Sequence, residues 1–268
     1  MKKQLFYITF ILFLISCEEK IAWDIESKSI VRLVVDGMIT NQQKAHSVKL
    51  SLPVLELNET SLSVSGAFVA ITDQENVFIL EEDPEIPGTY YTEPDVQGVL
   101  GKVYSLYIKI GEYEFSGSSY MVPVEPMAPL NVVPCDENNN YFYVESDQFG
   151  EPFIMKIKYD WSDSEDCEAN LCEALSIDYF LNTIDVNEIF KPEKQKVCFP
   201  SGTKLYRTKY SLNEDYREFL RAVMIESEWR GGLFDVERGN ISTNMSEGAI
   251  GYFAASTVLT DSIFFSDN

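Results

Sequence analysis

Histidine is nearly absent from this sequence of 268 residues, which contains only His46, and basic residues are scarce. A zinc site built on several histidines is therefore excluded, and a histidine-activated nucleophile would have to use His46. Only 21 Lys and Arg stand against 43 Asp and Glu, so the net charge is −22. That charge repels nucleic acid at long range, and nucleic-acid binding is not expected. With 14 glycines, 11 prolines and 45% hydrophobic residues, the chain is neither collagen-like nor disordered.

An apolar run stands at the amino terminus. Lys2 and Lys3 precede an almost unbroken apolar segment over residues 5–15. A helix of that length spans about 16 Å, whereas the hydrocarbon core of a bilayer is about 30 Å thick. The segment is therefore typical of an export signal rather than of a membrane span. We predict a lipoprotein signal peptide over residues 1–16.

The end of this signal resembles a bacterial lipobox, Leu14-Ile15-Ser16-Cys17. In a lipobox the chain is cut before the cysteine, whose thiol and new amino group are acylated, and several acyl chains anchor a protein stably. Residues 17–28 are then a lipidated tether, and removal of residues 1–16 leaves a net charge of −24. Glu18 and Glu19 resemble the surface-export signal of Bacteroidota lipoproteins. We expect an outer-membrane protein held in the lipid by acylated Cys17 on the cell-surface side; the alternative is an ordinary secretory signal.

Four cysteines follow the tether: Cys135, Cys167, Cys172 and Cys198. An even number in an exported protein indicates disulfides, with three possible pairings. The spacing of Cys167 and Cys172 could also be half of a metal site, but their loop contains no histidine. We predict two structural disulfides and no metal site.

Short β-like segments separated by turn residues fill residues 29–124. About seven strands at roughly ten-residue spacing are typical of an antiparallel sandwich. The pattern resembles the immunoglobulin-like or transthyretin-like modules of bacterial surface proteins. The expected strands cover residues 30–35, 46–52, 67–72, 77–80, 89–92, 103–110 and 113–116.

A proline-rich linker over residues 125–131 separates this sandwich from a second β-rich domain over residues 132–268. Prolines stiffen the chain and remove backbone donors. The second domain has expected strands over 141–144, 153–159, 176–181 and 203–210, with one or two more over 249–265. Its one amphipathic helix covers residues 214–229, where Asn213 can cap the first turn. The apolar residues at helical spacing are Tyr216, Phe219, Leu220, Val223 and Met224.

Two acidic loops contain enough oxygen ligands to raise the question of calcium binding. Residues 136–140 offer such ligands, but Tyr141 stands where an EF-hand loop needs glycine, and Asp147 stands at its last position. Solvated turns are predicted for both loops, with calcium binding as the alternative. The acids of the second loop are Asp160, Asp163, Glu165, Asp166 and Glu168.

No catalytic residue is predicted. Glycoside hydrolysis needs only two carboxylates, and 43 acids make some pair inevitable. The sequence contains no nucleophile elbow, P-loop or dinucleotide fingerprint, so no cofactor is expected. His46 lies in an alternating segment and is expected to be an exposed or half-buried strand residue. Core packing, with a ligand groove as the alternative, is expected for Tyr141, Phe142, Tyr143, Tyr159, Trp161, Tyr179 and Phe180.

Several segments in order resemble a Bacteroidota lipoprotein family known as domain of unknown function 4249. Besides the lipobox, they are residues 34–41 (VVDGMITN), 64–67 (VSGA), 71–73 (ITD), 87–90 (PGTY), 98–104 (GVLGKVY), 216–220, 239–241 (GNI) and 249–256 (AIGYFAAS). Two departures from the family are residues 234–238, where a proline-rich stretch is expected, and the acidic cysteine loop.

The resemblance implies a non-enzymatic accessory role beside a TonB-dependent receptor, because such lipoproteins are typically encoded next to these receptors. It implies no catalytic residues. Two alternatives stay open: a surface module that binds glycans or peptides or mediates adhesion, and a glycan hydrolase based on two carboxylates.

Overall fold

The structure is a computed structural model that describes residues 32–54, 59–135, 140–145, 150–164, 167, 172–181, 196–227 and 241–267. The predicted signal peptide and tether, with Cys17, Glu18 and Glu19, lie outside these residues. In the part of the chain that is described, no helix has the length and apolarity needed to cross a bilayer.

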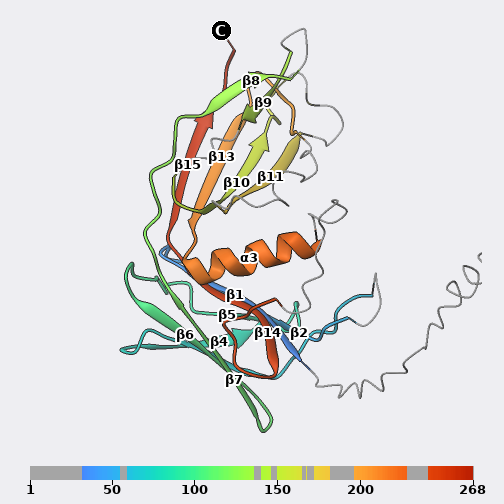
Figure 1. The fold of residues 1–268 in the computed structure, drawn as a ribbon. Helices are drawn as coiled ribbons and strands as arrows, with labels where there is room; N and C mark the ends of the chain where they lie inside the picture. Colours follow the sequence, from blue (N-terminus) through green and yellow to red (C-terminus); the bar gives the residue numbers. More distant parts are fainter. Residues whose placement is uncertain are drawn as a thin grey trace, which may run out of the picture. The chain divides into compact units, whose positions relative to one another are not determined.

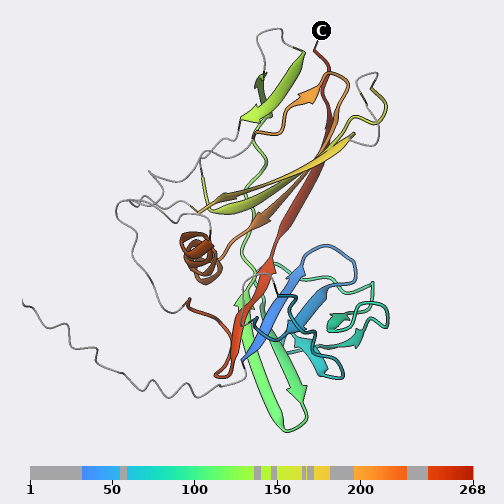
Figure 2. The same cartoon turned by 90° about the vertical axis from the view of Figure 1, so that its right-hand side faces the viewer.

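The largest sheet has eight strands in the order β14-β1-β2-β5-β4-β3-β6-β7 (Figures 1 and 2). Alternating apolar residues put one face of each strand into a common core; in β6, for example, Tyr104, Leu106 and Ile108 are fully buried. The strands are β1 Leu33–Thr40, β2 Ser47–Ser51, β3 Phe68–Thr72, β4 Val77–Glu82, β5 Thr89–Tyr91, β6 Val103–Ile110, β7 Tyr113–Tyr120 and β14 Ala249–Ser256.

This sheet is barrel-like and nearly closed, because its two edge strands are joined by the segment before β14. Met245 forms a bridge with Gly117 of β7. The Asn244 amide nitrogen donates to the carbonyl oxygen of Ser118 at 2.8 Å and to that of Phe253 at 2.7 Å. The backbone N–H of Ala255 donates to the hydroxyl oxygen of Ser119. Both sheet edges thus have partners, which protects them from pairing with other chains.

The structure does not confirm the antiparallel sandwich expected for residues 29–124. Its strands belong to one hydrogen-bonded sheet, and that sheet includes β14, which the sequence pattern placed in the second domain. β14 pairs in parallel with β1, with Leu33 opposite Ala249 and Thr40 opposite Ser256. The expected end of the first strand at residue 35 is also wrong, because β1 continues through Asp36 and Gly37.

The rest of the chain builds two smaller sheets (Figure 1). A four-stranded antiparallel sheet has the order β11-β10-β13-β15, and a three-stranded sheet has the order β12-β9-β8. The strands are β8 Asn131–Pro134, β9 Tyr141–Glu145, β10 Phe153–Asp160, β11 Glu173–Phe180, β12 Phe199–Pro200, β13 Lys204–Ser211 and β15 Val258–Phe264.

Two disulfides stabilise this region, as predicted. Cys135, directly after β8, bonds to Cys198, directly before β12. Cys167 bonds to Cys172 and closes the turn between β10 and β11. The first bridge closes a loop of 63 residues, and cross-links of long loops reduce the entropy of the unfolded chain most.

The predicted helix is α3 Glu214–Ser227. The Asn213 carboxamide oxygen accepts a hydrogen bond from the Tyr216 N–H at 2.8 Å, so the predicted cap is present. One side of α3 packs on the four-stranded sheet through Leu220 and Met224. Tyr216 also stacks on Tyr252 of β14 at 4.7 Å, so α3 contacts both sheets.

Candidate functional site

The segment 122–130, here called the strap, runs along β13 on one face of the four-stranded sheet. Pro123, Pro126 and Pro129 have no backbone N–H, so the strap cannot pair as an ordinary strand. Residues that precede proline favour extended backbone over helix, and residues 123–130 accordingly form no helix. A segment of this kind has to be held by donors from elsewhere.

Those donors come from alternate residues of β13. The Ser211 hydroxyl donates to the carbonyl oxygen of Val122 at 2.9 Å. The Lys209 ammonium donates to the carbonyl oxygen of Pro126 at 3.4 Å, and Arg207 Nη1 donates to that of Ala128 at 2.9 Å. Since residues two apart in a strand share a face, these side chains hold the strap antiparallel to β13.

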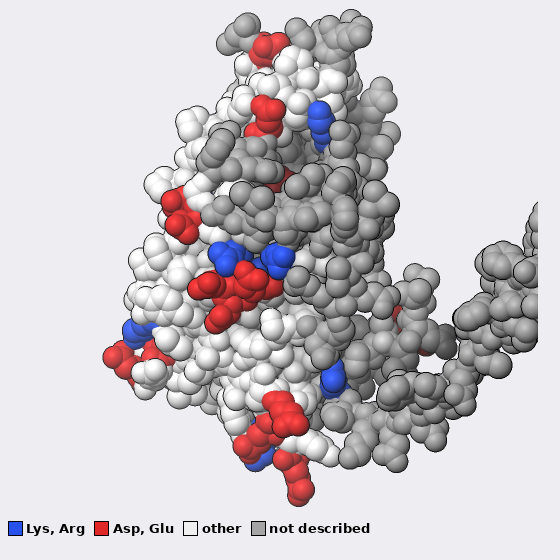
Figure 3. Space-filling view, viewed as in Figure 1, with Lys and Arg blue, Asp and Glu red and all other residues white. Residues whose placement is uncertain are grey.

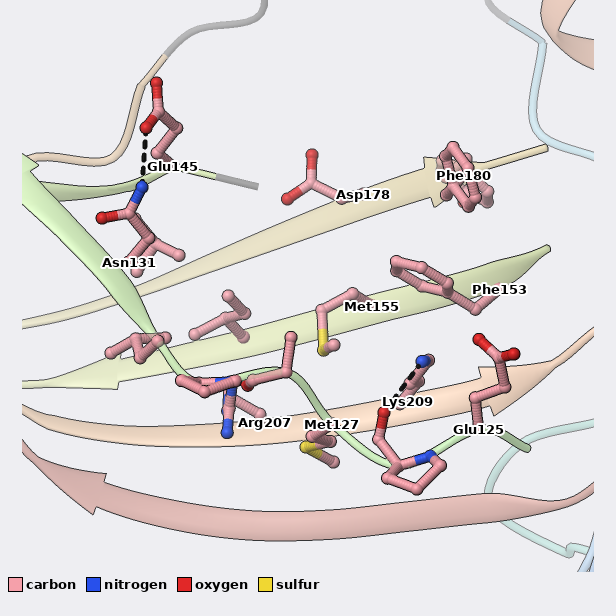
Figure 4. A pocket seen from close by; sticks show the side chains of 17 residues that line it. Glu125, Met127, Asn131, Glu145, Phe153, Met155, Asp178, Phe180, Arg207 and Lys209 are labelled. Atoms are coloured by element: carbon pink, nitrogen blue, oxygen red, sulfur yellow. Dashed lines mark hydrogen bonds between the residues drawn. The ribbon is translucent and has the colours of Figure 1, made fainter. Parts of the chain in front are cut away.

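A pocket of about 350 Å³ lies between the strap and the sheet (Figure 4). Such volumes are at the lower end of those of small-molecule sites. Its lining is mixed. The principal apolar side chains are Met127, Leu130, Val144, Phe153, Met155 and Phe180, and the polar ones are Glu125, Asn131, Glu145, Asp178, Arg207 and Lys209.

Arg207 is a buried cation in which each of the three side-chain nitrogens has a protein partner. Its side chain is 8% exposed, and its Nε donates to Asp261 Oδ1 at 2.9 Å while Nη2 contacts Oδ2. Asp261 stands directly opposite Arg207 in the pairing of β13 with β15. This bidentate pair, together with the Ala128 carbonyl, fixes the guanidinium at the wall of the pocket.

Lys209 is different, because its ammonium is buried with few partners. The residue is 5% exposed, and its Nζ lies 4.4 Å from the centre of the Phe153 ring. Burial lowers the pKa of Lys209, and the nearby Glu125 carboxylate opposes this only in part. Phe153 packs on Phe180 at 5.3 Å, so the ammonium stands beside an aromatic pair.

The sequence model of a protein family, described as domain of unknown function (DUF4249), matches residues 18–262 of the chain. The chain belongs to this family. The match confirms the resemblance to domain of unknown function 4249 and covers all strands of the structure except the end of β15. A search of the curated proteins finds no match to the chain.

The acidic loops considered for calcium are only partly described in this DUF4249 protein. Residues 136–139, 165, 166 and 168 lie outside the described residues. Asp160 accepts hydrogen bonds from the backbone and hydroxyl of Ser162, and Asp163 forms an ion pair with Lys204 at 2.7 Å. Within the described ranges, no group of three or more His, Cys, Asp or Glu side chains is arranged to hold a metal ion.

The excess negative charge is not gathered into one patch on the face shown in Figure 3. There, acidic side chains are spread over the described surface with basic ones beside some of them. On α3, for instance, Arg217 lies 2.9 Å from Glu218 and 3.7 Å from Glu214. Because the side chains of Glu214 and Glu218 are 84% and 45% exposed, these pairs contribute little to stability.

The expectation of an exposed or half-buried His46 is wrong. The residue is 1% exposed, and its Nε2 lies 3.2 Å from the carbonyl oxygen of Val96. The Thr40 N–H points to Nδ1 at 3.4 Å. His46 thus joins the end of β1 to a loop that precedes β6, and alternation alone could not reveal this contact because the loop is far away in sequence.

Burial of His46 predicts a pH-dependent stability. Burial lowers the pKa of His46 below its usual 6.5, against the opposing hydrogen bond to Val96. Because the unfolded chain then binds the proton more readily, the free energy of unfolding should be full above about pH 6.5 and fall as the pH decreases. Urea unfolding between pH 7.5 and pH 5.5 measures this change. A His46→Gln variant should have a flatter profile, and equal slopes would contradict the prediction.

Most aromatics considered for a groove are core residues. Phe142 and Tyr159 are buried with Phe199, and Trp161 packs on the same cluster. Tyr179 packs against α3, and Tyr143 lies under the ammonium of Lys196 at 4.2 Å. Tyr141 is 41% exposed. Tyr179 and Phe180 also line the pocket, so core packing and a groove coexist here.

The sequence analysis did not predict four parts of the pocket: Arg207, Lys209, Asp178 and the strap. A signal exists for the two cations: Leu205, Arg207, Lys209 and Ser211 alternate in β13, which places Arg207 and Lys209 on the face that carries buried Leu205. Cations on the inner face of a strand indicate a buried polar site, because burial of a charge without polar partners costs free energy of folding.

Proposed function

We propose that the protein is a non-enzymatic, surface-exposed outer-membrane lipoprotein that binds a small ligand and acts as an accessory component of a TonB-dependent receptor. The pocket under the strap carries the binding part of this proposal, since it combines an apolar floor with a few convergent polar groups. The lipobox ending at Cys17 supports the anchoring part.

Confinement to a membrane supports the accessory role physically. Two proteins held in one leaflet meet at a high effective concentration, so a weak interface is enough for a complex. The net charge of −24 after removal of residues 1–16 keeps the protein off anionic surfaces and leaves the acyl chains as its membrane attachment.

A pull-down from native membranes tests the accessory role. The tagged full-length protein is extracted in mild detergent, and co-purifying proteins are identified by mass spectrometry. We expect a TonB-dependent receptor well above the level recovered with an unrelated tagged lipoprotein. Recovery of no such receptor above that level would refute the docking.

Metabolic labelling tests the anchor. A clickable palmitate analogue should label the wild-type protein, and the Cys17→Ala variant should lose the label and leave the membrane fraction, because the acylated thiol is gone. A Cys135→Ala variant is the matched control and should keep the label. Label that persists in Cys17→Ala would contradict the lipobox.

A carboxylate-based glycan hydrolase is the second candidate, favoured by the three acids of the pocket, Glu125, Glu145 and Asp178. Glycosidases rely on a buried general acid beside a second carboxylate. Glu125 and Glu145 are exposed, and Glu145 accepts a hydrogen bond from the Asn131 amide at 2.7 Å. The arrangement fits ligand binding better than proton transfer.

A further inference from the structure

The environment of Lys209 leaves room for a ligand. An ammonium has three donors, and among the described residues this one donates a single hydrogen bond, of 3.4 Å, to the Pro126 carbonyl. With 5% exposure, water can replace the missing partners only from inside the pocket. A buried cation in this state favours an anionic group beside it.

The opposite side of the pocket carries negative charge. Asp178 in β11 and Lys209 in β13 both stand opposite Met155 of β10. Figure 4 shows Asp178 and Glu145 on one side of Met155, with Lys209 and Arg207 on the other. Because neighbouring strands are about 4.8 Å apart, the backbones of Asp178 and Lys209 are about 10 Å apart.

This charge arrangement disfavours a simple anion. A ligand with negative charge only would gain at Lys209, but it would be repelled by Asp178 and Glu145 across the pocket, by Glu125 near Lys209, and by the net charge of the whole protein. A simple cation would be repelled by Lys209. A ligand with one charge of each sign at opposite ends matches both sides.

The apolar lining between the two sides sets the character of the ligand's body. Met127 and Met155 face the pocket beside Phe153 and Phe180. Methionine side chains adapt to different apolar shapes, and the ring pair offers a flat surface. Since an extended chain spans at most about 3.5 Å per residue, two or three residues bridge the distance of about 10 Å.

We infer that the pocket binds a short peptide with free termini and apolar side chains, which has its carboxylate at the Lys209 ammonium and its amino group near Asp178 and Glu145. This inference rests on the proposed ligand-binding function and specifies its ligand class.

Calorimetric titration of the purified full-length protein in detergent tests the inference with three probes: the tripeptide Leu-Ala-Phe, its N-acetyl form and its C-terminal amide. We expect the free tripeptide to bind with a Kd below about 1 mM, and each blocked form to bind at least about tenfold more weakly. Equal affinity of the amide and the free peptide would overturn the assignment of Lys209, and binding of none of the three would overturn the ligand class.

Variants separate the role of Lys209 from folding. The free peptide should bind to Lys209→Met at least about tenfold more weakly than to the wild type. Amidation of the peptide should not weaken this binding further, as expected if the Lys209 ammonium contacts the peptide carboxylate directly. Lys204→Met, in the same strand but exposed and paired with Asp163, should bind like the wild type. If Lys209→Met fails to fold, the comparison of free and amidated peptide on the wild type still decides.

The outcomes also separate this inference from the docking proposal. If the peptides fail to bind while a receptor co-purifies, the ligand class is wrong and the accessory role stands. If the peptides bind as expected and no receptor co-purifies, the pocket assignment stands and the accessory role is wrong.

Discussion

Replacing Gly251 with alanine is expected to lower the free energy of unfolding by about 4 kcal/mol. Gly251 has a φ of +94° in the middle of β14, opposite Val35 of β1. A Cβ at this position would overlap the carbonyl oxygen of Val35 and would lie 2.9 Å from its carbonyl carbon and 3.0 Å from its nitrogen. Backbone strain of about 1–3 kcal/mol and steric overlap of about 1–3 kcal/mol add to this figure.

Gly202→Ala is the matched control for this prediction. Gly202 has a similar φ of +87°, but no atom lies within 4 Å of the point that an added Cβ would occupy. It should therefore cost only the conformational penalty, about 1–2 kcal/mol. Urea unfolding of both variants gives the comparison, with the slope m as a check on two-state behaviour. Equal costs would show that β14 does not pair with β1 in this register.

The success of sequence reasoning for most strands has a simple physical origin. Residues 103–110 and 204–210 alternate between more buried and more exposed positions, and that period belongs to the strand itself. The features that predict the helix are also local in sequence, since the capping residue Asn213 and the apolar spacing of residues 216–224 lie within one segment. Such features do not depend on the rest of the fold.

The pairing of β14 with β1 could not be predicted in the same way. The two strands are separated by more than 200 residues, and no local pattern connects them. β14 is buried along most of its length, which fits a parallel strand covered on both faces. The very short β12 and the proline-containing β8 were also missed, because two to four residues carry too little periodicity.

The pocket was hidden for a related reason. Its polar groups come from β8, β9, β11, β13 and the strap, and only the fold brings them together. The number of disulfides followed from the count of cysteines, whereas the pairing of Cys135 with Cys198 required the three-stranded sheet. The proline-rich segment predicted to be a linker is, in the structure, a wall of the candidate site.

The Arg207–Asp261 pair leads to the second large effect: Asp261→Asn should lower the free energy of unfolding by about 3 kcal/mol. This change leaves the buried guanidinium, 8% exposed, without a countercharge. Arg207→Met should cost less, about 1–2 kcal/mol, because Asp261 is 37% exposed and water can solvate it. Both changes break the same ion pair. Asp261→Asn costs more because it leaves the buried Arg207 unpaired, whereas Arg207→Met leaves the more exposed Asp261 unpaired.

An exposed pair with the same strand geometry provides the control for this asymmetry. Lys109 and Glu114 stand directly opposite each other in β6 and β7, with side chains 47% and 54% exposed. Glu114→Gln should therefore change the free energy of unfolding by no more than about 0.5 kcal/mol. Chemical unfolding of the three variants at pH 7 measures the differences. If Asp261→Asn costs no more than Glu114→Gln, Arg207 is not a buried cation and the strap is not held to β13 through it.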